Sequence, residues 1–281
     1  ADGALLLATT EGNGGLHVFS LADPSNPTGI AFEGVSSGLH TGTFADIAGK
    51  RYVFAAQNPN SPALRIFEIN PLAADPIVPV KSVPIPSNYG IHDTFVRDGL
   101  AFVSAWNTGL IIFDEGNGVE GGTPANPVEV SRIVTAANGV SGGAQVHNAW
   151  WFHNPVTSEN RYVFVGQEGP ATIGSTASGD LHVVDISNIQ APVEVASLRI
   201  SGAGVHNLWM DEARQILYAA WYNGGVVAID VSGELAGDLT GRIVARTEPG
   251  SPNTFTWGVM LFEGSLYAAD MATGFWQLTP P

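Results

Sequence analysis

Three features of the sequence predict an all-β fold built from one repeated sheet. The 281 residues include 34 glycines and 18 prolines and are only 13% charged, which is typical of many short strands joined by tight turns. Runs of β-forming apolar residues, such as RYVFAAQ and RYVFVGQ, recur along the chain. A histidine segment also recurs, at intervals of about 50 to 60 residues, as GLHTGTF, GIHDTF, QVHNAW and GVHNLW.

Together these features indicate a β-propeller. Each histidine segment precedes three further apolar runs, so the repeated unit has four strands. A sheet of this kind cannot cover its own apolar faces and must stack against neighbouring copies in a ring. We therefore expect a single β-propeller domain over residues 1–281, with six blades of four antiparallel strands and incomplete first and last blades. A five-bladed ring with an irregular closing sheet is the alternative.

The expected strands follow the chain blade by blade. The first blade lacks its innermost strand and has strands at 4–10, 15–21 and 28–33. Four complete blades then open at the four histidines, and the last blade, which opens at 255–261, lacks its outermost strand. The other strands are expected at 51–57, 64–69, 78–85, 100–106, 109–115, 127–134, 161–167, 180–187, 192–200, 216–222, 225–232, 241–248, 265–270 and 274–280.

Charge and composition exclude several classes of partner. The net charge is −15 and only 11 residues are Lys or Arg, which argues against nucleic acid and against an anionic membrane surface. No apolar run approaches the roughly 20 residues that span a bilayer, so we expect no membrane insertion. With no cysteine, disulfides and thiolate chemistry are absent. The acidic, lysine-poor composition favours a secreted or periplasmic protein, and the oligomeric state stays open.

The third strands of the repeat carry a recognisable pattern. The segments GLHVFSLADPSNP, GDLHVVDISNIQAP and GGVVAIDVSG resemble the LVIVD-repeat proteins, and the similarity extends over nearly the whole chain. The resemblance implies a bacterial, often exported propeller. It implies little about activity, because propellers support unrelated functions. The function is therefore argued from the histidines, which the repeat pattern does not include.

Four histidines hold one repeat position. Because the first strand of a blade lies nearest the ring axis, we expect His40, His92, His147 and His206 to face one point, with Trp257 at the fifth copy. Neutral imidazoles that face one point are ligands for a transition metal, here Fe, Cu, Zn or Mn. The alternative is that they line a water-filled channel and bond to one another and to backbone carbonyls.

Further candidates lie beside these histidines and on the same rim. Asp93 and Glu168 are the candidate catalytic acid or base groups. Glu168 could also replace a histidine as a metal ligand, although a solvated loop charge is the favoured interpretation of this residue. Aromatic and amide side chains on the rim suit a small neutral molecule, a sugar or a glycan. The candidate substrate-binding residues are Trp106, Trp221, Trp257, Gln57, Asn107 and Asn223. Trp106 and Trp221 are expected at matching places in two blades, and packing between blades is the alternative role for each tryptophan.

We therefore expect a metal-dependent enzyme that activates dioxygen, water or a substrate oxygen. An oxidoreductase is favoured, because an all-imidazole set without a carboxylate suits Fe or Cu. A metal-dependent lyase or hydrolase acting on a sugar or lactone, with Asp93 or Glu168 as base, is the close rival. A non-catalytic binding or scaffold propeller is the third reading. The sequence contains no dinucleotide loop, P-loop, GxSxG or HExxH motif.

Overall fold

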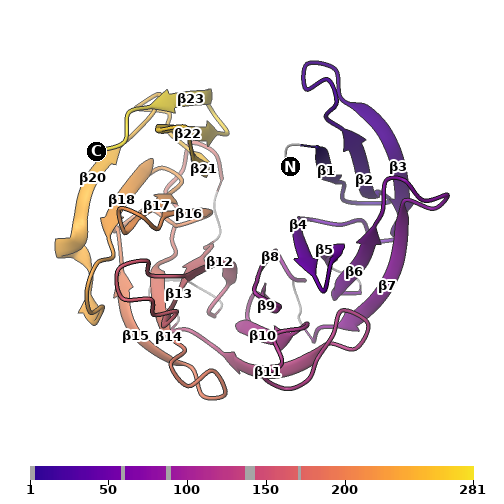
Figure 1. Cartoon of the computed structure of the whole chain (residues 1–281). Coiled ribbons are helices and arrows are strands. Elements are labelled where there is room, and N and C mark those ends of the chain that lie inside the picture. Colours follow the sequence, from indigo (N-terminus) through magenta and orange to yellow (C-terminus); the bar gives the residue numbers. More distant parts are fainter. Residues whose placement is uncertain (1–3, 58–60, 87–89, 137–142, 170–171) are drawn as a thin grey trace. The chain divides into compact units, whose positions relative to one another are not determined.

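The computed structural model describes residues 4–57, 61–86, 90–136, 143–169 and 172–281. The chain consists of two compact units, residues 1–132 and 133–281. The strands of the described residues form six small sheets of three to five strands, which are the blades of a six-bladed β-propeller. The predicted fold class is therefore confirmed (Figure 1). The single domain over residues 1–281 stays a prediction.

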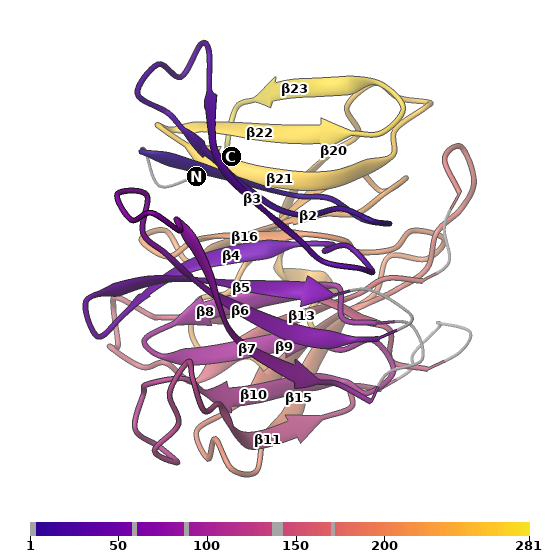
Figure 2. The same cartoon turned by 90° about the vertical axis from the view of Figure 1, so that its right-hand side faces the viewer.

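The first unit contains three antiparallel sheets. The first has three strands, β1 (Leu5–Thr9), β2 (Gly15–Ser20) and β3 (Thr28–Gly34). The second has β4 (Gly42–Ile47), β5 (Lys50–Gln57), β6 (Ala63–Ile69) and β7 (Ile77–Pro84). The third has β8 (Asp93–Arg97), β9 (Leu100–Ser104), β10 (Leu110–Asp114) and β11 (Val128–Ile133). Figure 2 shows how the strands lie side by side within each of these sheets.

The second unit repeats this plan. Its first sheet has β12 (Val146–Phe152), β13 (Tyr162–Gln167), β14 (Leu181–Asp185) and β15 (Val193–Leu198), and the short β19 (Gly237–Asp238) joins β15 in parallel. The next has β16 (Leu208–Asp211), β17 (Ile216–Ala220), β18 (Val226–Asp230) and β20 (Ile243–Thr247), which follows the single-turn helix η1 (Thr240–Arg242). The last has β21 (Thr256–Phe262), β22 (Ser265–Asp270) and β23 (Gly274–Leu278).

The strand predictions are confirmed except at two points. The first and last sheets have three strands each, as expected. The pairing of β19 with β15 was not expected, because a two-residue strand leaves no periodic signal in the sequence. His40, His92 and His206 lie one or two residues before β4, β8 and β16, and only His147 lies inside its strand.

Apolar side chains pack between neighbouring sheets. In the first unit, Phe54 and Ile66 of the second sheet meet Val103 and Ile111 of the third. In the second unit, Phe164 and Val183 pack against Leu217 and Val227, which form part of the largest core. β9 and β10 are buried along their whole length, so both faces of this sheet are covered. This packing of two-faced sheets is what the repeat predicted.

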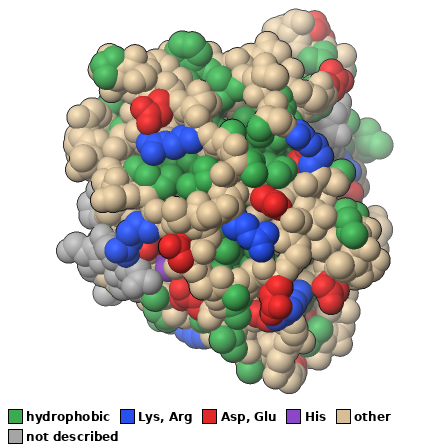
Figure 3. Space-filling view, turned by 90° about the vertical axis from the view of Figure 1, so that its left-hand side faces the viewer, with side chains coloured by type: hydrophobic (Ala, Val, Ile, Leu, Met, Phe, Trp, Pro, Cys, Tyr) green, Lys and Arg blue, Asp and Glu red, His purple; other side chains and the backbone are tan. Residues whose placement is uncertain are grey.

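Charged side chains are dispersed over the surface. On the face shown in Figure 3, basic side chains lie singly beside acidic ones. In the second unit, Arg161 contacts Asp185 at 2.7 Å and Arg246 contacts Glu248 at 2.8 Å. Among the described residues, no helix has the length and apolar character needed to cross a lipid bilayer.

Glu115 is a buried carboxyl group at the end of β10. Its relative exposure is 0%, and neither carboxyl oxygen has a hydrogen-bond partner among the described residues. The matching positions after β14 and β18 hold the apolar residues Ile186 and Val231. Burial, together with the neighbouring charge of Asp114, raises the pKa of Glu115 to about 9. Asp114 behaves oppositely: burial opposes its ionisation, but backbone N–H donors beginning with that of Gly116 lower its pKa to about 2.

Stability should depend on pH through Glu115. Because its folded-state pKa lies above the ordinary value of 4.5, folding favours the neutral acid. The contribution of Glu115 to the free energy of unfolding should be greatest below pH 4.5 and should fall as the pH rises toward 9, by at most about 1.4 kcal/mol per pH unit. Glu115→Gln should remove this dependence in urea unfolding measured between pH 5 and 9. Glu120→Gln, at an exposed position nearby, is the control, and an unchanged slope in Glu115→Gln would contradict the assignment.

Candidate metal centre

The recurring histidines hold one backbone position in each sheet. The amide N–H groups of His40, His92 and His206 donate to carbonyls at the end of the second strand of the same sheet, at 2.7, 3.0 and 2.8 Å. His147 lies at the corresponding start of β12, where the neighbouring Val146 pairs with Gln167. The innermost strand of each of these sheets therefore begins with an imidazole beside the loop that follows the second strand.

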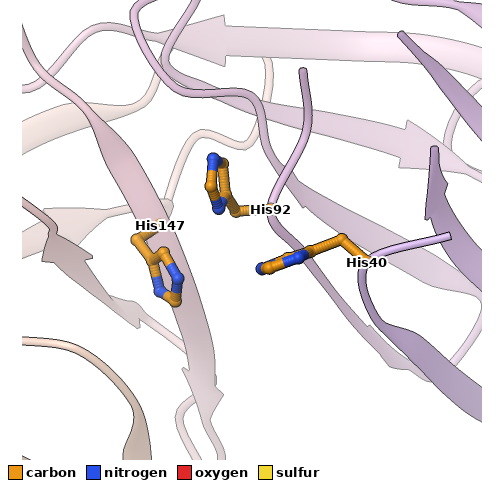
Figure 4. A group of neighbouring side chains, drawn as sticks. All are labelled: His40, His92 and His147. Carbon is orange, nitrogen blue, oxygen red and sulfur yellow. The ribbon is translucent and has the colours of Figure 1, made fainter. Parts of the chain in front are cut away.

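In the first unit the structure brings His40 and His92 together. Their rings meet edge to face with centroids 4.8 Å apart (Figure 4). His40 Nδ1 lies 2.7 Å from Glu11 Oε1, and because a carboxylate only accepts, Nδ1 carries the proton and Nε2 keeps a lone pair. The ring of His92 stacks on that of Trp106 at 4.3 Å. The threonine hydroxyl of Thr41 donates to the carbonyl of His92 at 2.8 Å and ties the two inner strands together.

In the second unit His147 and His206 lie against each other, and the Nε2 atoms of both face Glu168. Their ring centroids are 4.0 Å apart. His147 Nε2 is 3.4 Å from Glu168 Oε2, and His206 Nε2 is 3.9 Å from Glu168 Oε1. One ligand atom from each of the three residues lies within 4.8 Å of the others. We call these three residues the His147–Glu168–His206 cluster.

Two features bring His206 into this cluster. Its Nδ1 donates to the carbonyl oxygen of Trp257 at 2.8 Å, which leaves the lone pair on Nε2, the nitrogen that faces Glu168. Gly166 of β13 allows the segment of His206 to approach, because a Cβ at that glycine would lie 3.0 Å from the His206 carbonyl oxygen. The ligand nitrogen is thus oriented by backbone contacts on both sides of the histidine.

The three residues of the cluster could hold a metal ion. Zinc binds histidine nitrogens and carboxylate oxygens at about 2.0 to 2.2 Å, which places two ligands of one ion about 3 to 3.5 Å apart. The 3.4 and 3.9 Å separations between nitrogen and oxygen are close to this range. The side chains of His147 and Glu168 are 3% and 20% exposed, so the site is largely buried but reaches solvent. Two imidazoles and one carboxylate are the ligand set of catalytic zinc sites and of non-haem iron sites.

Tyr222 is a member of the site that the sequence did not reveal. Its hydroxyl donates a hydrogen bond to Glu168 Oε1. The residue as a whole is 4% exposed. Burial raises the pKa of Tyr222 above its ordinary value, and the negative charge of Glu168 is the next largest cause of this rise. Its ring also lies beside His206, with centroids 5.0 Å apart. Comparison of the loops after the second strands could have found it, because Tyr222 holds the loop position of Glu168 and Trp106.

The prediction that Trp106 and Trp221 match is wrong. The Ala105 amide donates to the Gly109 carbonyl and the Trp221 amide to the Gly225 carbonyl, so Trp221 corresponds to Ala105. Trp106 then corresponds to Tyr222, and both adopt positive φ angles, of 53° and 41°. Trp221 is 0% exposed and packs in the core of the second unit, which is the packing role considered for it above.

The other predicted site residues have different settings within their own units. Asp93 opens β8 opposite Ser104 and is half-buried. Gln57 Oε1 accepts a hydrogen bond from Arg65 at 2.9 Å. Asn107 follows Trp106 and is half-buried, whereas Trp257 is 44% exposed and lies 5.9 Å from the ring of His206. Asn223 bonds to the backbone of Ala177 and of Gly202, so its amide connects two loops.

The convergence of all four histidines on one point stays a prediction. The structure assigns His40 and His92 to one unit and His147 and His206 to the other, and it brings the members of each pair together. Among the described contacts within one unit, only the second pair has one carboxylate near the Nε2 atoms of both histidines. The all-imidazole set expected from the sequence therefore becomes, in the second unit, a set of two histidines and one glutamate.

Comparison with known proteins supports the fold. No protein-family model and no curated protein sequence matches the chain. Sqt1 from Chaetomium thermophilum is similar in structure, with a TM-score of 0.61, 14% identity, and coverage of 95% of this chain and 67% of Sqt1. A second Sqt1 structure, bound to the N-terminus of the ribosomal protein L10, has a TM-score of 0.61, 13% identity, and coverage of 98% and 72%.

An enzyme is also among the structural neighbours. A protein of Bacteroides uniformis assigned as a 6-phosphogluconolactonase has a TM-score of 0.64 and 12% identity, over 94% of this chain and 75% of that one. At these identities the likenesses show the fold alone. The chain is thus similar to β-propellers of unrelated function, and its own function is argued from its site.

Proposed function

We propose that the protein is a metal-dependent hydrolase that opens lactones or related esters of a small, sugar-like molecule. The observation that carries this proposal is that Glu168 oxygens lie 3.4 Å from the Nε2 atom of His147 and 3.9 Å from that of His206. Because a carboxylate belongs to the set, the reason to prefer redox chemistry, an all-imidazole site, no longer applies to this cluster. The similarity to a propeller assigned as a lactonase supports the choice of substrate class.

The residues of the cluster have separate tasks in this reaction. A bound divalent metal supplies Lewis acidity and lowers the pKa of a bound water. His147 and His206 offer neutral Nε2 atoms, the second of them held by the carbonyl of Trp257. Glu168 offers one carboxylate oxygen. Water adds to the lactone carbonyl carbon, the ring C–O bond breaks, and the ring oxygen takes a proton, so the product is a hydroxy acid.

Oxygenation by an iron-loaded site is the second candidate. The observation that favours it is the same ligand set, because two histidines and one carboxylate also hold non-haem Fe(II). A binding or scaffold role is the third, favoured by the structural similarity to Sqt1 bound to a ribosomal-protein N-terminus. In that case a peptide or glycan occupies the propeller and the histidines are dispensable.

Membership of the LVIVD-repeat proteins and export to the periplasm or beyond are part of the proposal. The third-strand motifs, such as GDLHVVDISNIQAP, support the first, and the acidic, cysteine-free composition supports the second. An exported hydrolase of this kind would meet small neutral or sugar-derived substrates. The metal would be Zn or Mn for hydrolysis and Fe or Cu for oxidation.

Metal binding is the first prediction of this proposal. The purified, untagged protein should bind about one equivalent of Zn²⁺ or Co²⁺ per chain in a calorimetric titration. His147→Ala and Glu168→Gln should each weaken binding by about 10- to 100-fold or more, since each removes a donor. His153→Ala, a histidine outside the cluster in the same unit, is the control. Binding below about a tenth of an equivalent in the wild type, or unchanged binding in both cluster variants, would refute the metal site.

Activity is the second prediction. Metal-loaded protein should hydrolyse a panel of sugar and aliphatic δ-lactones, followed by acid release in a pH-stat, and chelation should abolish the activity. His147→Ala combined with His206→Ala should lower kcat/KM by about 100-fold or more. Consumption of dioxygen by the iron-loaded protein without lactone hydrolysis would favour the second candidate. Metal-independent peptide or glycan binding that survives the double change, without either activity, would favour the third.

A further inference from the structure

Tyr222 is held rigidly at the edge of the His147–Glu168–His206 cluster. It lies in the loop between β17 and β18 with a φ of 41°. Its amide donates to the carbonyl of Thr256 at 2.8 Å, and its carbonyl accepts from the amide of Thr256 at 2.9 Å. Its ring packs on Phe255 with centroids 4.6 Å apart, and Ala177 completes this small core. The backbone and the ring are therefore both held by contacts that do not involve the hydroxyl group.

The hydroxyl divides the two oxygens of Glu168 between different partners. It donates to Oε1, which lies 3.9 Å from His206 Nε2, whereas Oε2 is the nearer oxygen to a histidine, at 3.4 Å from His147 Nε2. A carboxylate that binds an ion through both oxygens occupies two coordination positions, and one that binds through a single oxygen leaves a position open. Donation to Oε1 uses one of its lone pairs and weakens it as a ligand.

We propose that Tyr222 is a positioning residue that keeps Glu168 a one-oxygen metal ligand and so leaves a coordination position for water or substrate. This inference rests on the metal site of the proposed function. The last sheet then supports the site indirectly, because Phe255 and Thr256, at the start of β21, hold Tyr222 in place. Partners of this kind usually tune metal affinity and ligand orientation.

Co²⁺ is the probe that tests the inference, because its visible absorption weakens as its coordination number rises. Tyr222→Phe keeps the ring packed on Phe255 and removes only the donor. The variant should still bind one Co²⁺ per chain, with an affinity within about tenfold of the wild type. Its visible absorption per bound Co²⁺ should fall about twofold, and kcat should fall about tenfold with KM little changed.

Tyr218→Phe is the matched control. Tyr218 is 0% exposed in the neighbouring strand β17, and its hydroxyl has no hydrogen-bond partner among the described residues. The control should have the wild-type Co²⁺ spectrum and kcat. A thermal melt of both variants distinguishes a loss of packing from a change at the site.

Each outcome of this experiment decides something. A Tyr222→Phe spectrum equal to those of the wild type and of Tyr218→Phe overturns the role of Tyr222 and leaves the metal site intact. Loss of Co²⁺ binding in Tyr222→Phe alone also overturns it, because the phenol would then be needed for binding rather than for the open position. Absence of Co²⁺ binding in the wild type overturns the metal site and this inference together.

Discussion

Apolar side chains buried between stacked sheets are the constraint on which the rest of the structure depends. β9 and β10 are buried along their whole length, so the sheet that contains them is stable only between neighbours. Within each unit, stacking brings the starts of the innermost strands and the loops after the second strands close together. In both units the histidine is placed in the same way, because the amide N–H groups of His40 and His206 donate hydrogen bonds to carbonyls at the ends of second strands. The histidines therefore meet in pairs because the sheets stack.

The last sheet contributes the frame of the site in the second unit rather than a ligand. Asp270 accepts hydrogen bonds from the amide of Phe255 at 2.6 Å and from the hydroxyl of Thr256 at 3.0 Å. The same segment forms hydrogen bonds with the backbone of Tyr222. The carbonyl oxygen of its next residue, Trp257, accepts a hydrogen bond from His206 Nδ1. One anchored segment thus fixes the orientation of an imidazole and of the phenol that contacts the carboxylate. Such support is what a preorganised metal site requires.

Most of the fold could be predicted from the sequence, because the runs of β-forming apolar residues and the recurring histidine segment repeat blade after blade. The incomplete first and last sheets were visible for the same reason. Glu168 was a candidate from its place after a second strand, but its contact with Tyr222 was harder to predict. The two residues hold one loop position, yet one is acidic and the other aromatic, so residue type alone does not link them. The prediction for Trp221 was wrong by one residue: Trp221 is the last core position before the turn, whereas Trp106 and Tyr222 hold the next position, which has a positive φ and faces the site. Spacing cannot reveal such a shift, whereas backbone hydrogen bonds do.

The account stands on one metal ion held by His147, Glu168 and His206. Anomalous scattering from crystals soaked in Zn²⁺ or Co²⁺, recorded on both sides of the absorption edge of the metal, tests this most directly. The account predicts a single strong peak about 2.0 to 2.2 Å from the Nε2 atoms of both histidines and from one oxygen of Glu168. Peaks only at other places, with the three side chains in their present contacts and no density between them, would contradict it.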